Sequence, residues 1–496
     1  MSESDRLSTT IDRHKSAIVR SDLSRPVRLA LEAQVFRPGS TFFDYGCGHG
    51  SDIDRVRDLG FEASGWDPFF RPSSEKRAAS IVNLGFVLNV IEDPAERVAA
   101  LRDAWSLAQD VLIVAAQVVL DYLGENVVSF GDGVITKRNT FQKYFEQKEL
   151  KDYIDTVLGV ESVPAGLGVY FVFRDAARTE LFRSSRFHSR RSTPRVRVKV
   201  KRFEDYEQLL APLISFITER GRLPVKGELA EENEIIGEFR TLNRAFKLIS
   251  QATSDSDWEQ LATRRREDLL VYIALSNFSK RPKFGLLPDE LKYDVKSFFG
   301  SYKKACEEAD QMLFSLGQEG VVKKECRTSN IGKLVPDGLY VHVTAIESLP
   351  PLLRLYEGCA SRTVGRMDGA TLVKFHTDKP KISYLYYPTF DEESHPPLHS
   401  SVRIDLRDLH VKYSDYSTYA NPPILHRKET FVASDYVNFE KFRNLTVEEE
   451  SAGLLESPVS IGTREGWERR LLERSVKIVD HQVLRLEEEE RVGEDS

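Results

Sequence analysis

The residues with the clearest chemical potential form a glycine-rich segment, Asp44-Tyr45-Gly46-Cys47-Gly48-His49-Gly50. Glycines let the backbone approach a ligand closely and adopt positive φ. The apolar run 41–45 leads into this segment and predicts a strand. A second acid, Asp67, follows Asp44 by 23 residues and ends the next predicted strand, 61–66. An acid at that position can hold both hydroxyls of a ribose, so the pattern predicts a nucleoside-containing cofactor.

The spacing of the glycines indicates which cofactor. Dinucleotide-binding folds use GxGxxG, whereas Gly46, Gly48 and Gly50 give GxGxG, preceded two residues earlier by Asp44. An acid there suits a cationic cofactor with a free amine and a sulfonium, and it would repel a pyrophosphate. The segment resembles motif I of class I S-adenosylmethionine-dependent methyltransferases. A glycine-rich turn without a ligand is the alternative, and a nicotinamide-dependent enzyme is disfavoured.

The elements around this segment indicate an α/β fold. Predicted strands 41–45, 61–66, 81–88, 111–119 and 169–173 alternate with predicted helices 53–59, 94–107 and 141–158. This alternation predicts a Rossmann-like parallel sheet covered on both faces. Only 13 residues separate Asp67 from Ile81, which is room for one crossover. The resemblance implies a helix, a strand and a helix there, so we predict that the third strand is missing or vestigial. Pro68-Phe69-Phe70 would then cover the adenine ring by packing.

A set of segments resembles one particular family, the methyltransferases associated with bacterial DNA phosphorothioation systems. They are 13–18 (RHKSAI), 23–27 (LSRPV), 43–50 (FDYGCGHG), 65–68 (GWDP), 83–92 (NLGFVLNVIE), 140–145 (TFQKYF) and 421–431 (NPPILHRKETF). The resemblance implies a bacterial protein that works beside DNA modification genes, with other phosphorothioation proteins as partners. It supplies no substrate.

The carboxyl ends of parallel strands meet at one edge of a sheet, where open α/β sheets bind ligands. The residues expected to bind S-adenosylmethionine are Asp44, Tyr45, Gly46, Cys47, Gly48, Gly50, Asp67, Pro68, Asn83, Leu84 and Gly85. No general base is evident, and Asn89, Lys143 and Tyr144 are the candidates for catalysis. Lys143 and Tyr144 could equally be the solvent and core faces of one helix. His14 and Lys15 lie in a segment that could cap the pocket. Cys47 is expected to be a small buried residue rather than a nucleophile.

A basic segment follows the α/β part of the chain. Residues 181–203 contain nine Lys/Arg and no acid, which could bind the phosphates of DNA or tRNA. The residues expected to do so are Arg190, Arg191, Arg195, Arg197, Lys199 and Lys201. Because 195–201 alternates, it could equally be an exposed edge strand whose charges prevent aggregation.

Asn421-Pro422-Pro423-Ile424 is similar to the motif with which DNA amino-methyltransferases bind a flipped base. Its fourth residue has no aromatic face, however, and the motif lies far from the glycine segment. A proline turn is therefore the favoured interpretation. The scattered histidines of the C-terminal part could hold a metal, but no metal-ligand spacing supports such a site, so no metal ligand is predicted.

Length and composition limit the remaining possibilities. The 496 residues are enough for about three domains, with 41% hydrophobic residues and a net charge of −7 that argues mildly against a DNA-binding protein. The expected parts are a helical extension (1–38), the methyltransferase domain (39–178), a basic linker or edge strand (179–203), a helical domain (204–330), a β-rich domain (331–460) and a helix with an acidic tail (461–496).

The longest apolar stretch, about ten residues, is too short to span a membrane, and four distant cysteines favour neither disulfides nor zinc. We expect a cytoplasmic S-adenosylmethionine-dependent methyltransferase. The alternative is a catalytically silent nucleic-acid-binding accessory protein that retains a cofactor fold.

Overall fold

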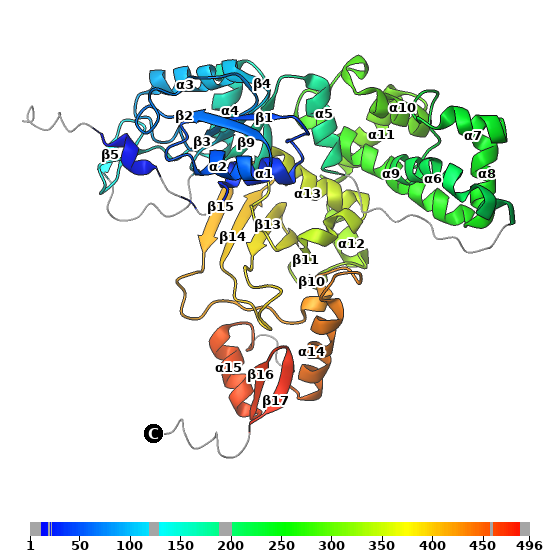
Figure 1. The fold of residues 1–496 in the computed structure, drawn as a ribbon. Helices are drawn as coiled ribbons and strands as arrows, with labels where there is room; N and C mark the ends of the chain where they lie inside the picture. Colours follow the sequence, from blue (N-terminus) through cyan, green and yellow to red (C-terminus); the bar gives the residue numbers. More distant parts are fainter. Residues whose placement is uncertain are drawn as a thin grey trace, which may run out of the picture.

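The computed structural model describes residues 11–17, 20, 22–118, 128–187, 201–456 and 460–486. Figure 1 shows a mixed α/β sheet in blue and teal, a group of helices in green extending to one side of it, and a second sheet in yellow and orange beneath it.

A six-stranded Rossmann-like sheet forms the N-terminal part, in the order β2-β1-β3-β4-β9-β8. Its strands are β1 (Thr41–Tyr45), β2 (Glu62–Trp66), β3 (Ala79–Gly85), β4 (Ala108–Ala115), β8 (Val163–Gly166) and β9 (Val169–Phe173). The first four are parallel. β2 is the edge strand, and residues 67–78 contain turns and an isolated bridge but no further strand, as the short spacing predicts.

Two expectations about this part are wrong. The sheet is not wholly parallel, because β9 runs antiparallel to β4 and β8 antiparallel to β9. Gly168, with φ +67°, makes the tight turn between β8 and β9. Residues 141–158 are not one helix: β7 (Phe141–Gln142) precedes α4 (Gln147–Leu158). A capping box between Glu146 and Glu149 fixes the start of α4.

Helices cover both faces of the sheet. They are α1 (Arg25–Glu32), α2 (Ser51–Asp58), α3 (Pro94–Leu107), α4 and α5 (Ala176–Ser185). α3 and α4 contribute to the core on one face, and α1, α2 and α5 contribute to the core on the other. The Asp93 side chain caps α3 by accepting the Ala95 N–H at 2.8 Å, so the predicted helix 94–107 is confirmed. The short 3-10 turn η2 (Arg13–Ser16) and the small sheet of β5 (Val128–Phe130), β6 (Gly133–Ile135) and β7 lie outside these layers.

Helices fill the middle of the chain. They are α6 (Lys201–Arg220), α7 (Glu232–Phe239), α8 (Leu242–Ala252), α9 (Asp255–Leu275), α10 (Asp289–Phe299), α11 (Tyr302–Ser315) and α12 (Val321–Thr328), with the 3-10 turns η3 (Ser276–Phe278) and η4 (Phe284–Leu286). Two apolar cores hold them, one centred on α6 and α8 and one on α9, α10 and α11. No helix in the described ranges is both long and apolar enough to cross a membrane.

An antiparallel six-stranded sheet, in the order β10 to β15, forms the C-terminal part. Its strands are β10 (Lys333–Val335), β11 (Gly338–His342), β12 (Leu372–His376), β13 (Lys381–Tyr386), β14 (Ser400–Asp405) and β15 (Val411–Asp415). η5 (Val343–Ser348) and α13 (Pro351–Thr363) pack on it. The chain then forms η6 (Lys428–Thr430), α14 (Phe439–Ser451), α15 (Arg464–Glu473) and the hairpin of β16 (Val476–Val479) and β17 (Gln482–Arg485).

Candidate functional site

The glycine segment forms a tight turn between β1 and α2. Gly46, Gly48 and Gly50 have φ of +79°, +53° and +89°, a region that residues with a Cβ rarely adopt. A Cβ at Gly46 would lie 2.5 Å from Cγ2 of Val87. The turn is fixed to β2, because the Gly46 and Cys47 N–H groups donate to the Trp66 carbonyl at 2.8 and 3.1 Å. Glycine is therefore required here by both conformation and space.

Two polar side chains meet beside this turn at the carboxyl ends of adjacent parallel strands. Asp44 on β1 pairs in register with Asn83 on β3, and Asn83 Nδ2 donates to Asp44 Oδ1 at 2.8 Å. They are only 5% and 2% exposed. The other amide atom, Asn83 Oδ1, is buried without a hydrogen-bond partner among the described residues. An unpaired buried acceptor costs free energy, so this oxygen is available to a ligand donor.

A third polar group, Asp52, comes from the first turn of α2. It is buried, and its Oδ1 accepts the Ser24 N–H at 2.6 Å. Burial, and then the charge of Asp52, raise the pKa of Asp44 to about 7. Arg20 lines the same space, and its positive charge opposes this rise in the pKa of Asp44. With two carboxylates against one arginine, the lining is net negative when both acids are ionised and favours a cationic group.

A cavity of about 40 Å³ lies at these groups. It is lined by Arg20, Ser24, Asp44, Gly46, Cys47, Ser51, Asp52, Asn83, Gly85 and Phe86. Five of these were predicted from the sequence; Arg20, Ser24, Ser51 and Asp52 were not. Asp52 gave no distinctive signal, because acids are common in the first turn of any helix. The volume suits a small charged group and is far below the roughly 300 Å³ or more of a typical cofactor pocket.

Asp67 lies at the end of β2, beside the glycine turn. Its carboxylate accepts three backbone N–H groups, from Gly48 at 3.0 Å, Phe69 at 2.9 Å and Phe70 at 2.8 Å. These bonds hold the glycine turn against the turn that begins at Pro68. The ring of His14 stacks on Phe69 with centroids 4.1 Å apart, so the N-terminal segment covers this turn.

Several predicted site residues do not line the cavity. The Tyr45 hydroxyl donates to Asp103 at 2.8 Å, and Leu84 lies fully buried in the apolar core. Asn89 Nδ2 donates to the Gln142 side chain at 2.9 Å.

The two other catalytic candidates, Lys143 and Tyr144, also lie outside the cavity lining. The Lys143 ammonium forms ion pairs with Glu149 at 2.8 Å and Asp132 at 3.3 Å. Both carboxylates stabilise the protonated ammonium, which argues against Lys143 as a general base. Cys47 does line the cavity, but burial raises the pKa of its thiol to about 12, which argues against a thiolate nucleophile.

The predicted nucleic-acid residues Arg190, Arg191, Arg195, Arg197 and Lys199 lie outside the described residues. Lys201 is the first residue of α6, so the predicted edge strand does not include it.

The Asn421-Pro422-Pro423-Ile424 motif connects two parts of the C-terminal region. Asn421 Oδ1 accepts the Glu465 N–H at the start of α15 at 3.0 Å. Pro423 forms an isolated bridge with Thr463. These contacts give the motif a structural role.

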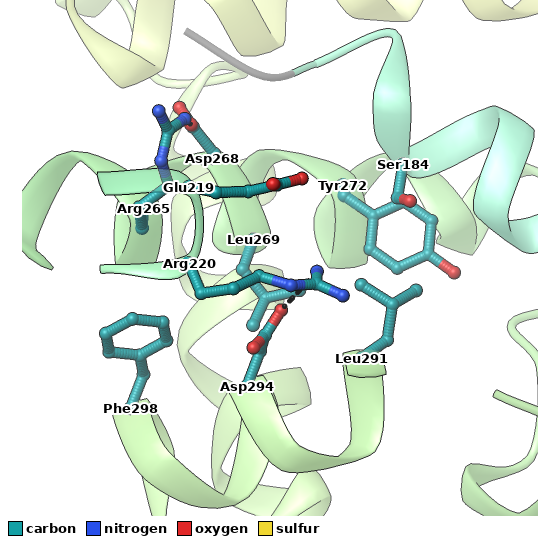
Figure 2. A pocket seen from close by; sticks show the side chains of 10 residues that line it. All are labelled: Ser184, Glu219, Arg220, Arg265, Asp268, Leu269, Tyr272, Leu291, Asp294 and Phe298. Carbon is teal, nitrogen blue, oxygen red and sulfur yellow. Dashed lines mark hydrogen bonds and ion pairs between the residues drawn. The ribbon is translucent and has the colours of Figure 1, made fainter. Parts of the chain in front are cut away.

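A second cavity, of about 20 Å³, lies among α5, α6, α9 and α10 (Figure 2). Arg220 reaches Asp294 at 3.2 Å across it, and Arg265 pairs with Asp268 at 2.8 Å beside it. Tyr272, on its wall, donates its hydroxyl to Glu180 at 2.6 Å. The charges are paired and the space is about that of a water molecule, so this cluster connects helices and is a poor ligand site.

Comparisons with known proteins give weak matches that lie on part of the chain. No protein-family model matches, and no curated protein matches. Among solved structures, the 1,6-didemethyltoxoflavin-N1-methyltransferase of Burkholderia thailandensis, solved with 1,6-didemethyltoxoflavin and S-adenosylhomocysteine, is 14% identical with a TM-score of 0.21, over 30% of this chain and 74% of that one. An O-methyltransferase family protein of Burkholderia thailandensis is 15% identical with a TM-score of 0.21, over 29% of this chain and 54% of that one.

The CcbJ methyltransferase of Streptomyces caelestis is 15% identical with a TM-score of 0.21, over 31% of this chain and 86% of that one. The match to the O-methyltransferase family protein of Burkholderia thailandensis spans about half of that protein's length. Identities and TM-scores this low do not establish an activity. A proposal about function must therefore be argued from the residues of this chain.

Proposed function

We propose that this chain binds S-adenosylmethionine at the glycine turn and transfers its methyl group to an acceptor. The supporting observation is the pair of buried carboxylates, Asp44 and Asp52, beside a glycine turn, in a cavity where Arg20 is the only lysine or arginine of the lining. A ligand with an amine and a sulfonium adds positive charge beside these two carboxylates, whereas they would repel a pyrophosphate.

Each group of the pocket has a role in this proposal. Asp44 and Asp52 attract the cationic end of the cofactor, and the unpaired Asn83 Oδ1 accepts from its amine. The glycine turn lets the ligand approach the backbone, and Asp67 accepts one ribose hydroxyl at Oδ2, the oxygen that has a single N–H donor. Bound S-adenosylmethionine supplies an electrophilic methyl group, and the protein contributes mainly by positioning it.

The cavity holds only the charged end of such a cofactor. We therefore place the adenosine against the turn after β2, where His14 now stacks on Phe69. Binding would replace this contact with a stack between Phe69 and the adenine. Hydrogen exchange of residues 11–17 should change when S-adenosylhomocysteine is added, and unchanged exchange would contradict this placement.

We propose that the methyl acceptor is a nucleic acid. The protein would act in association with bacterial DNA phosphorothioation. The support is the basic segment 181–203 together with the sequence resemblance. Replacing its arginines with alanine should reduce the salt dependence of nucleic-acid binding. An unchanged salt slope would exclude the segment as the contact.

Calorimetry with S-adenosylmethionine and S-adenosylhomocysteine tests cofactor binding. Wild type should bind both, and Asp44→Asn should bind S-adenosylmethionine at least about tenfold more weakly, because one ionic contact is worth more than about 1.4 kcal/mol in a buried site. The matched control is Asp58→Asn, an exposed acid at the end of α2, which should not change the affinity. Absence of binding by the folded wild type would refute the proposal.

A catalytically silent accessory protein is the second candidate. It is favoured by the ion pairs that occupy Lys143 and by the placement of Asn89 outside the cavity lining. A turnover assay with labelled methyl donor and phosphorothioated DNA, plain DNA and RNA separates the two. Cofactor binding without transfer to any of them would favour the silent protein.

A further inference from the structure

Far from the glycine turn in sequence, three residues of the C-terminal part converge. His395 comes from the loop between β13 and β14, His426 from the segment after β15, and Glu449 from α14. Each offers one ligand atom, and these atoms lie within 4.8 Å of one another. The histidines are 31 residues apart and the glutamate follows after 23 more, so no short motif links them.

The Glu449 carboxylate is buried, and both of its oxygens lack a hydrogen-bond donor among the described residues. Its side chain is 1% exposed, and no lysine or arginine in the described part of the chain lies within 4 Å of it. His395 Nε2 is 2.7 Å from Glu449 Oε1, but neither carboxylate oxygen has a hydrogen-bond donor of acceptable geometry among the described residues. A buried carboxylate without a donor or a cation is strongly unfavourable.

The ring of His426 is oriented as in a metal ligand. Its Nε2 lies 2.8 Å from the Ile461 carbonyl oxygen. A carbonyl only accepts, so Nε2 carries the proton and Nδ1 carries the lone pair. Nδ1 is buried with no partner among the described residues. Metal-binding histidines typically donate their second ring N–H to a carbonyl or carboxylate in this way.

Lys428, a buried cation in the same part of the chain, is already hydrogen-bonded to other groups. The Lys428 ammonium donates to the carbonyls of Phe390 at 2.7 Å and Glu393 at 2.6 Å, and lies 3.2 Å from His481 Nε2. It therefore forms no ion pair with Glu449 and acts on it only from a distance. Trp467 packs on both imidazoles, with ring centroids 4.5 Å from His395 and 4.6 Å from His426, and holds them in place.

We propose that His395, His426 and Glu449 bind a divalent transition-metal ion, with Zn²⁺ as the ion that suits two imidazoles and one carboxylate. A zinc ion bound at about 2.0–2.2 Å separates its ligand atoms by about 3.3 Å. Small side-chain shifts would produce this spacing. His395 Nε2 and Glu449 Oε1, now 2.7 Å apart, would separate slightly, and ligand atoms that are up to 4.8 Å apart would move closer together. The ion would fasten α14 to the two loops and so to the C-terminal sheet.

Zn²⁺ alone, titrated into the full chain after removal of metals, is the test. Wild type should bind one ion at this site and unfold at a higher temperature with Zn²⁺ present, because a ligand of the folded state stabilises it. His426→Ala and Glu449→Gln should each lower the affinity by at least about 100-fold, as expected when a metal ligand is lost. The control is His410→Ala, an exposed histidine, which should bind Zn²⁺ as wild type does.

A second measurement does not depend on the variants folding. Co²⁺ added to wild type should give visible absorption that Zn²⁺ abolishes in equimolar amounts. Wild type that binds neither ion would overturn the proposal. So would folded His426→Ala and Glu449→Gln variants with wild-type affinity, since Zn²⁺ would then bind elsewhere.

Discussion

Two buried carboxylates, Asp44 and Glu449, have no lysine or arginine within 4 Å among the described residues, yet their surroundings differ. Asp44 lies beside glycine backbone, a second carboxylate and the amide of Asn83. Glu449 lies beside two imidazole rings, and Trp467 packs on both of these rings. The first set can surround an organic cation with backbone and hydrogen-bonding groups. The second set presents nitrogen lone pairs, which are suited to a metal ion.

The comparison shows that burial alone does not define a ligand. In both regions an ionised carboxylate is unfavourable without a partner, but the atoms around it select what the partner is. The following predictions test this difference between the two regions, in order of decreasing expected effect.

The largest expected effect is on the glycine turn. Gly46→Ala adds a Cβ at φ +79° and within 2.5 Å of Val87, and should cost about 3–5 kcal/mol of unfolding free energy from strain and overlap together. Gly60→Ala is the control for strain alone, because Gly60 has φ +88° and nothing within 4 Å of its added Cβ; it should cost about 1–3 kcal/mol. Urea denaturation measures both, and equal losses would show that the contact with Val87 is unimportant.

The next effect is on stability in the Asp44 pocket. The folded pKa of Asp44 is raised from 3.8 to about 7, so the stability it contributes is present below about pH 4 and is lost as the pH rises through 7. Asp44→Asn should therefore stabilise the ligand-free chain at pH 8, by up to about 4 kcal/mol, and change little at pH 4. Denaturation at both pH values measures this. A variant that is less stable than wild type at pH 8 would contradict an unpaired buried charge.

The same titration should govern cofactor binding, with the opposite sign. The ionised Asp44 attracts the cationic end of S-adenosylmethionine, so affinity should fall by up to about tenfold per pH unit below pH 7. Calorimetry between pH 5.5 and 8 tests the slope. Asp44→Asn should give a flat profile, and a slope that persists in this variant would assign the titration to another group.

Sequence reasoning could predict the first region because its signals are local. Within 27 residues the chain contains the strand 41–45, the turn Gly46 to Gly50 and the acid Asp67. The residue types at each of these positions can be explained by local conformation or by the chemistry of the side chain. The missing third strand followed from a chain length, which is also local. The antiparallel β9 was not predictable in the same way, since an apolar run such as Val169–Phe173 is compatible with either direction.

The second region could not be found from the sequence, because its residues are distant along the chain and meet only in the folded C-terminal part. His395 and His426 are two of six histidines between 342 and 426, and nothing in their spacing separates them from His399 or His410. What distinguishes them is the burial of their partner Glu449 and the bond from His426 to the Ile461 carbonyl. Both depend on the tertiary structure.

The smallest expected effect is that of a substitution in one region on ligand affinity in the other. They share no residue, and the groups that each proposal uses belong to different apolar cores and different sheets. Energetic effects of distant sites without common partners are additive to within about 0.5 kcal/mol. Asp44→Asn should therefore leave the Zn²⁺ affinity unchanged, and His426→Ala should leave the S-adenosylmethionine affinity unchanged. A reciprocal change in both affinities would be linkage between the sites, and would show that one conformational equilibrium connects the glycine turn to α14.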